Sequence, residues 1–175
     1  GRAWTFKTKP APMSAGPDYE LKISHTDPDA DFYTLQGAID FCATHIDLNA
    51  PKTFRMDDGI YQEIIYLRDQ SNITVKGNAD NTAVNIQYDN SNDINGGIGG
   101  GVNIDQFAPV GTVVPSSGGR SVVILDGNSD KIRFENVTIE NAYGWTLGKN
   151  GQAEALYINN KSAAFVNCRV LSFQD

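Results

Sequence analysis

The chain has 175 residues, of which 40% are hydrophobic and 20% charged, and its formal net charge is -7. This length is sufficient for one domain with a core, and the acidic balance argues against nucleic acid or an anionic membrane as a partner. No apolar run approaches the roughly 20 residues that span a bilayer. Two cysteines, Cys42 and Cys168, are too few for a disulfide framework, and we expect Cys168 to be a buried thiol.

The first predicted element with clear periodicity is a helix within residues 31–45. Residues 1–30, which precede it, contain much of the proline and little periodicity. The helix is expected to begin after the N-cap Thr34 and to end near His45. Its apolar face recurs at helical spacing: Leu35, Ala38, Ile39, Cys42 and Ala43.

After this helix the chain carries short apolar-alternating segments separated by Asn- and Gly-rich turns. Three of these segments are similar to one another: 73–77, 132–136 and 163–167. Repeats of this kind, with no helical pattern between them, predict stacked parallel coils rather than βαβ units. Asn136 and Asn167 occupy equivalent bends, where we expect their amides to bond to one another along the stack.

The alternating order breaks between about residues 89 and 120, where turn-forming residues predominate. The glycine run there is not a phosphate loop, because no Gly-Lys-Ser/Thr follows it. We therefore expect a long loop that leaves the stack of coils, and loops of this length are often functional.

Candidate chemical groups outside the last stretch are few. Glu63 is interpreted as a structural side chain that bonds turn amides rather than as a second catalytic carboxylate. The two histidines, His25 and His45, have no cysteine or second histidine at metal-ligand spacing, so we predict no metal and no cofactor. No G-x-S-x-G motif is present, which disfavours a Ser-His-Asp hydrolase.

Residues 151–175 combine alternating apolar positions with an acid and two amides. The apolar positions predict strands with one buried face: Leu156, Ile158, Ala164, Val166, Cys168 and Val170. Gln152 precedes these strands, and Gln174 and Asp175 follow them. An acid beside amide donors suits acyl chemistry, because the acid moves a proton while the amides hold a developing oxyanion.

Four segments resemble motifs of the pectin methylesterase family. Residues 152–156 (QAEAL) are similar to Q-A-V-A-L, residues 164–169 (AFVNCR) to A-F-x-N-C-R, and residues 172–175 (SFQD) to the start of G-Y-Q-D-T-L. Residues 31–40 (DFYTLQGAID) are similar to D-F-x-T-[VIL]-Q-x-A-I-D. The resemblance extends over most of the chain.

The resemblance implies an all-β fold, a right-handed parallel β-helix whose N-terminal end is capped by the predicted helix. It implies that Asp175 acts as general acid and then as general base, and that Gln152 and Gln174 donate to the oxyanion. The expected organisation is one domain with four parts: an extension (1–30), the capping helix (31–45), and the coils (46–175) with a long loop (89–120).

The implied substrate is pectin, a homogalacturonan polysaccharide, from which methyl esters are removed with release of methanol. Tyr143, Trp145 and Phe173 are the aromatic residues expected to contact its sugar rings. We expect a secreted protein with no nucleic acid, membrane or obligate protein partner. Two alternatives remain open: a β-helix relative that acts on another ester or thioester, and a non-catalytic carbohydrate-binding solenoid.

The resemblance also implies groups that this sequence does not contain. Family members carry their nucleophilic aspartate in a D-F-I-F-G motif and an arginine in a later R-P-W motif, and neither motif occurs here. We therefore expect an incomplete domain, truncated on its C-terminal side and inactive alone. Glu154 replaces a usually apolar residue, and the sequence leaves open whether it faces the cleft or the core.

Overall fold

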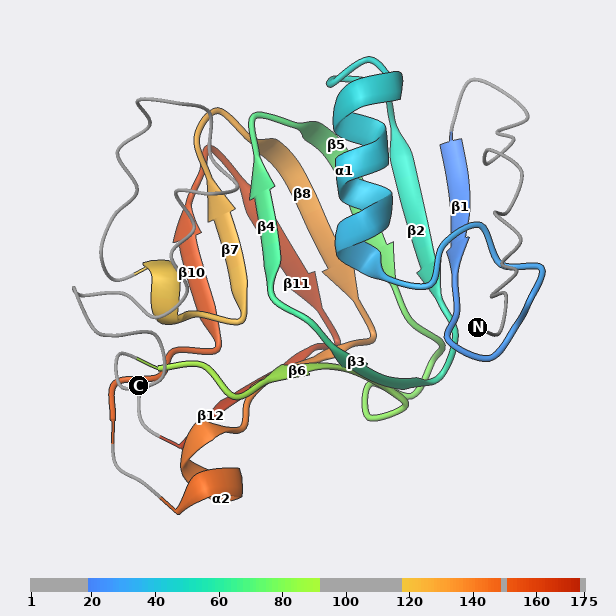
Figure 1. Ribbon diagram of the computed structural model, residues 1–175. Helices are drawn as coiled ribbons and strands as arrows, with labels where there is room; N and C mark the ends of the chain where they lie inside the picture. Colours follow the sequence, from blue (N-terminus) through green and yellow to red (C-terminus); the bar gives the residue numbers. More distant parts are fainter. Residues whose placement is uncertain (1–18, 92–117, 149–150, 174–175) are drawn as a thin grey trace, which may run out of the picture.

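The computed structural model describes residues 19–91, 118–148 and 151–173. Within these residues, parallel strands form three sheets that wrap around one core (Figure 1). In chain order the elements are β1 (Tyr19–Ile23), α1 (Leu35–His45), β2 (Lys52–Met56), β3 (Gly59–Gln62), β4 (Ile65–Arg68), β5 (Ser71–Lys76), β6 (Val84–Tyr88), the 3-10 turn η2 (Gly118–Arg120), β7 (Val123–Asp126), β8 (Asp130–Glu135), β9 (Thr138–Asn141), α2 (Tyr143–Leu147), β10 (Leu156–Asn159), β11 (Ala163–Val166) and β12 (Arg169–Ser172).

Successive coils pass through the three sheets in a fixed order. The coil β2-β3-β4 is followed by β5-β6-β7, then by β8-β9-β10, and then by β11 and β12. The resulting sheets have the strand orders β1-β2-β5-β8-β11, β12-β9-β6-β3 and β10-β7-β4, and all their pairings are parallel. The predicted parallel β-helix is confirmed.

The three similar segments of the sequence stack in register. Ile132 pairs with Ile73 on one side and with Ala163 on the other, so one row of inward side chains crosses β5, β8 and β11. In the next inward row the rings of Phe134 and Phe165 stack with centroids 5.4 Å apart. Each fully buried aliphatic or aromatic side chain contributes about 1.5–3 kcal/mol, so these rows hold the coils together.

The expected inward face of β11 was wrong at two positions. Ala164 and Val166 are exposed, whereas Ala163 and Phe165 pack against the core. Ile158 in β10 and Val170 in β12, which we also expected to be buried, are 50% and 47% exposed. Alternation persists only within a strand, and the turn of residues 160–162 between β10 and β11 changes which residues of the chain face inward.

The predicted asparagine stack is confirmed. Asn136 and Asn167 both adopt left-handed backbone conformations, with φ of 55° and 50°. Asn167 Nδ2 donates to Asn136 Oδ1 over 2.8 Å. Asparagine tolerates this conformation better than most residues, so it can turn the chain and still bond to the next coil.

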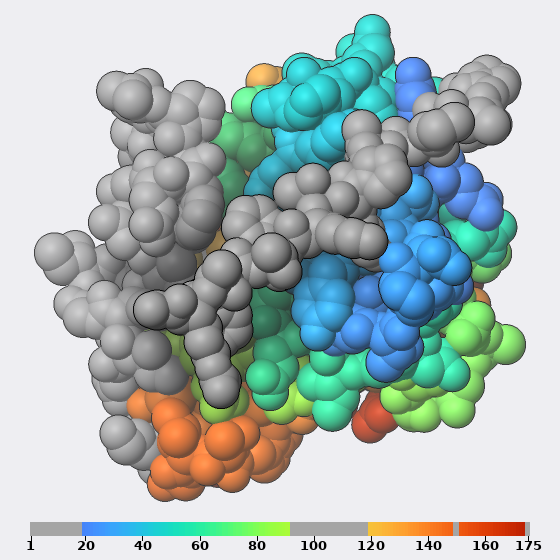
Figure 2. All heavy atoms as spheres, turned by 45° about the vertical axis from the view of Figure 1, so that its right-hand side comes forward, coloured from blue at the N-terminus to red at the C-terminus, as the bar shows by residue number. Residues whose placement is uncertain are grey.

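Helix α1 closes one end of the stack, as predicted. It begins after Thr34, whose hydroxyl accepts from the Gly37 N–H over 3.1 Å, and it packs against β1, β2 and β4. Cys42, on the inward face of this helix, is buried in the core as a free thiol. Ala43, which we expected on the same face, is exposed. In Figure 2, α1 (cyan) and the orange segment that contains α2 lie at opposite margins of the visible face.

Candidate active site

Gln152 lies close to the end of β12, although β10 and β11 separate the two in the sequence. Gln152 is exposed and follows α2, just before β10. The hydroxyl of Ser172, the last residue of β12, donates to the carbonyl oxygen of Ala153. Phe173 comes next and is half exposed, while Gln174 and Asp175 lie outside the described residues.

The side chain of Gln152 is bound to Arg120, a residue that sequence reasoning did not select. Arg120 Nη1 donates to Gln152 Oε1 over 2.5 Å. Arg120 Nε in turn bonds both carboxylate oxygens of Glu154, at 2.6 and 2.5 Å. The sequence left open whether Glu154 faces the cleft or the core. In the structure its carboxylate is mostly buried and forms an ion pair with Arg120.

A buried asparagine fixes the backbone on both sides of this cluster. Asn141, at the end of β9, is inaccessible to solvent, and its Nδ2 donates to the carbonyl oxygens of Asn90, Arg120 and Glu154. Its Oδ1 accepts from the N–H groups of Asn90 and Tyr143. One amide thus holds the segments that carry Arg120, Gln152 and α2 at fixed positions, which is the support that a preorganised site needs.

Two of the three predicted aromatic contact residues are exposed beside Gln152. Trp145 and Phe173 are each 50% exposed, and their rings meet edge to face with centroids 6.1 Å apart. Tyr143, by contrast, is 1% exposed, so its ring is not available for stacking on a sugar. It starts α2 and packs inward, because the chain from Tyr143 to Leu147 forms a short helix.

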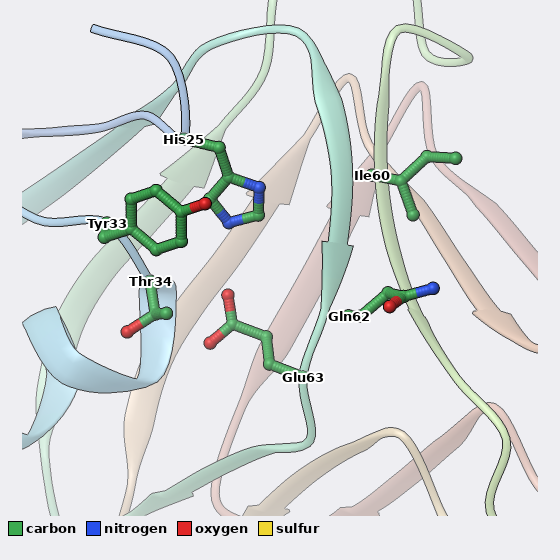
Figure 3. A pocket seen from close by; sticks show the side chains of 6 residues that line it. All are labelled: His25, Tyr33, Thr34, Ile60, Gln62 and Glu63. Carbon is green, nitrogen blue, oxygen red and sulfur yellow. The ribbon is translucent and has the colours of Figure 1, made fainter. Parts of the chain in front are cut away.

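Two open cavities lie beside β3 and β6, and one of them borders α2 at Thr146, the residue after Trp145. One, of about 340 Å³, is lined by Gln62, Gln87, Tyr88, Asp89 and Thr146. The other, of about 370 Å³, shares Gln62 and is lined further by His25, Tyr33, Thr34, Ile60 and Glu63. Figure 3 shows His25 and Tyr33 on one wall, Ile60 and Gln62 on the other, and Glu63 between them.

Glu63 has the structural role that the sequence suggested. Its two carboxylate oxygens accept from the N–H groups of Leu35, over 2.9 Å, and of Gln36, over 2.8 Å, in the first turn of α1. Burial raises the pKa of Glu63, while these two backbone donors act in the opposite direction. The carboxylate therefore fixes the helix end to the coil beneath it.

The structure also bears on the cysteines, on metal binding and on membrane-spanning helices in the described part of the chain. Cys42 and Cys168 are both free thiols, and Cys168, which we expected to be buried, is only partly buried. No three His, Cys, Asp or Glu side chains among the described residues gather as metal ligands would. No helix in these same ranges is long and apolar enough to cross a membrane.

The comparison with solved structures identifies the fold. The Aspergillus niger pectin methylesterase in deglycosylated form superposes with a TM-score of 0.64 and 20% sequence identity, over 93% of this chain and 46% of that one. The chain has the pectin methylesterase fold. The Escherichia coli protein YbhC gives a TM-score of 0.64 and 19% identity, over 98% of this chain and 47% of that one.

A pectin methylesterase in complex with a hexasaccharide also matches, with a TM-score of 0.59 and 18% identity over 85% of this chain and 42% of that one. The chain therefore spans slightly less than half the length of the solved structures that share the pectin methylesterase fold. No family model matches the sequence. No curated protein matches it either.

Proposed function

We propose that this chain supplies the acid and the oxyanion donors of a carboxylic ester hydrolase that removes methyl esters from pectin. The observation that carries the proposal is the hydrogen bond between Ser172, at the end of β12, and Ala153, the residue after Gln152, on a chain with the pectin methylesterase fold. Gln174 and Asp175 follow in the sequence, and three peptide units extend at most about 11 Å. We infer from this short separation in sequence that Asp175 lies near Gln152.

In the proposed reaction, attack on the ester carbonyl carbon forms a tetrahedral intermediate whose oxygen is negatively charged. The side-chain amides of Gln152 and Gln174 donate hydrogen bonds to this oxygen. Asp175 gives its proton to the methoxide oxygen as the carbon–oxygen bond breaks, so methanol leaves. The Asp175 carboxylate then takes a proton from the water that attacks the acyl group. In the family that this chain resembles, the nucleophile is an aspartate in a D-F-I-F-G motif. This sequence does not contain that motif, so we assign the nucleophile to no residue of this chain.

The surface around Gln152 supports a polysaccharide substrate. Trp145 and Phe173 present apolar ring surface of the kind that packs on sugars, and the two cavities beyond them are lined mainly by amide, hydroxyl and aromatic groups. A solved pectin methylesterase with a hexasaccharide has the same fold. We infer that a pectin chain lies over Trp145 and extends toward Tyr88.

The proposal is tested by methanol release from methyl-esterified pectin, measured on the protein as its gene encodes it. Asp175→Asn keeps the shape of the side chain but cannot transfer the proton, so turnover should be lost. Gln152→Ala should lower kcat about a hundredfold or more, the usual scale for one oxyanion donor. Asp29→Asn and Lys161→Ala, which change exposed residues that line neither cavity and have no role in the proposed reaction, serve as controls.

Three results would each reject part or all of the proposal. Hydrolysis of an acyl thioester without methanol release from pectin would assign the site to another ester. Binding of pectin oligosaccharides with no ester hydrolysis at all would indicate a carbohydrate-binding solenoid. Near-parent turnover by Asp175→Asn would remove Asp175 as the acid even if the protein is a pectin esterase.

A further inference from the structure

We propose that Arg120 is a positioning residue that fixes the side-chain amide of Gln152 with its NH2 group directed away from the guanidinium. The value of this orientation for catalysis rests on the proposed function, in which that NH2 donates to the oxyanion. The orientation itself rests only on the contacts between Arg120, Gln152 and Glu154.

The contacts place Arg120 as a bridge between the other two side chains. Its Nη1 lies 2.5 Å from Gln152 Oε1, and its Nε lies 2.6 and 2.5 Å from the two oxygens of Glu154. The side chains of Arg120 and Glu154 are only 13% and 20% exposed. Charge-assisted bonds in such a shielded place are stronger than surface ion pairs, so the guanidinium is held firmly.

The chemistry of the two groups allows only one orientation of the amide. A guanidinium carries donors and no acceptor, and it stays protonated at any pH that the fold tolerates. If the Gln152 amide rotated by half a turn, its NH2 would face the Nη1 donor and the bond would be replaced by repulsion. The carbonyl oxygen therefore faces Arg120, and the NH2 group is directed elsewhere.

Glu154 and Asn141 hold the guanidinium in place. Both oxygens of Glu154 bind Nε, which fixes the plane of the guanidinium and aims Nη1 at Gln152. Asn141 Nδ2 donates to the backbone carbonyl oxygens of both Arg120 and Glu154, at 3.2 and 2.9 Å. The presence of an acidic residue at position 154 is thereby explained, since an apolar side chain there would leave Nε without these two acceptors.

A kinetic double-mutant cycle tests whether Arg120 acts through Gln152. Arg120→Met should lower kcat about tenfold with little change in KM, a smaller loss than the hundredfold or more for Gln152→Ala. In the Gln152→Ala background, Arg120→Met should cause no further loss, because the two residues form one unit. Independent losses that multiply, or an unchanged kcat in Arg120→Met, would overturn the proposal.

A second variant guards against misfolding, because Arg120→Met leaves the mostly buried Glu154 without its cation. The pair Arg120→Met with Glu154→Leu removes both charges and should fold, since replacing an ion pair by apolar side chains is often neutral or stabilising. It should show the same tenfold loss of kcat. If Glu154→Leu kept the parent kcat while Arg120→Met lowered it, Arg120 would position Gln152 without help from Glu154.

NMR of the side-chain NH2 of Gln152, assigned by its disappearance in Gln152→Ala, gives a readout independent of activity. In the parent protein this group should be rigid on the nanosecond timescale, and the Arg120→Met/Glu154→Leu pair should make it mobile. Equal mobility in both proteins would refute the positioning role. Absence of esterase activity in the parent would reject the proposed function, while the NMR result would still decide the orientation.

Discussion

Gly144→Ala should disable the site while leaving the fold intact, because Phe173 lies directly against this glycine. A Cβ built on Gly144 comes closer than 3.0 Å to three carbons of Phe173, and one of them is the Cβ of Phe173. Rotation of the ring about χ1 does not move that Cβ, so the backbone after β12 has to shift. Carbon atoms pack at about 3.5–4.0 Å, so the required displacement is roughly 1 Å.

The expected loss of kcat follows from the position of Phe173 directly before the proposed catalytic residues. Gln174 and Asp175 come next in the sequence, and a misplacement of about 1 Å in a catalytic group can lower the rate about a hundredfold. Stability should fall by only about 1–3 kcal/mol, the usual cost of overpacking. Methanol release from esterified pectin gives kcat, and urea unfolding gives the free energy of unfolding.

Gly148→Ala is the matched control at the other end of α2. A Cβ there meets nothing within 4 Å, but the backbone has φ of +61°, so the substitution costs stability without a clash. It should therefore leave kcat near the parent value. In the Phe173→Gly background, Gly144→Ala should cause a smaller loss, because both the Cβ and the ring carbons of Phe173 are gone. Parent-like kcat in folded Gly144→Ala would refute the reasoning.

Three further outcomes follow from the described contacts. Burial raises the pKa of Glu63 in the folded state, so this carboxyl binds more protons when folded than when unfolded between about pH 4.3 and its folded pKa. Its contribution to the free energy of unfolding should fall as pH rises through that window, and chemical denaturation of Glu63→Gln across pH should lack this slope. Asn167→Ala should cost about 1–3 kcal/mol by urea unfolding, and Asn167→Gly less, because glycine keeps the left-handed φ but loses the bond to the preceding coil. Finally, the side chains that line the two cavities include the acidic Glu63 and Asp89 and no lysine or arginine among the described residues, so highly esterified pectin should be bound better than demethylated pectin. Added salt should narrow that difference in a binding titration, and an equal or reversed preference at low salt would contradict it.

Elements whose causes are local or periodic could be predicted from the sequence. The capping hydroxyl of Thr34 and the apolar spacing from Leu35 to Cys42 are sufficient to place α1, because capping and helical periodicity act within a few residues. The coil repeats are visible because each coil must offer an apolar side chain to the same inward row. For that reason the alignment of segments 73–77, 132–136 and 163–167 predicted both the stacking and the Asn136–Asn167 bond.

Tertiary structure alone decided which of the candidate groups meet. Nothing near Arg120 in the sequence marks it as a partner of Gln152, since the contact joins residues 32 apart on different coils. The acidic Glu154 was the only signal, because a carboxylate in a mostly apolar motif needs a cation. The burial of Tyr143 was likewise decided by the path of α2, which turns the ring inward and leaves Trp145 at the surface. Side-chain direction at a bend depends on the packing of neighbouring coils, and a local sequence pattern does not contain that information.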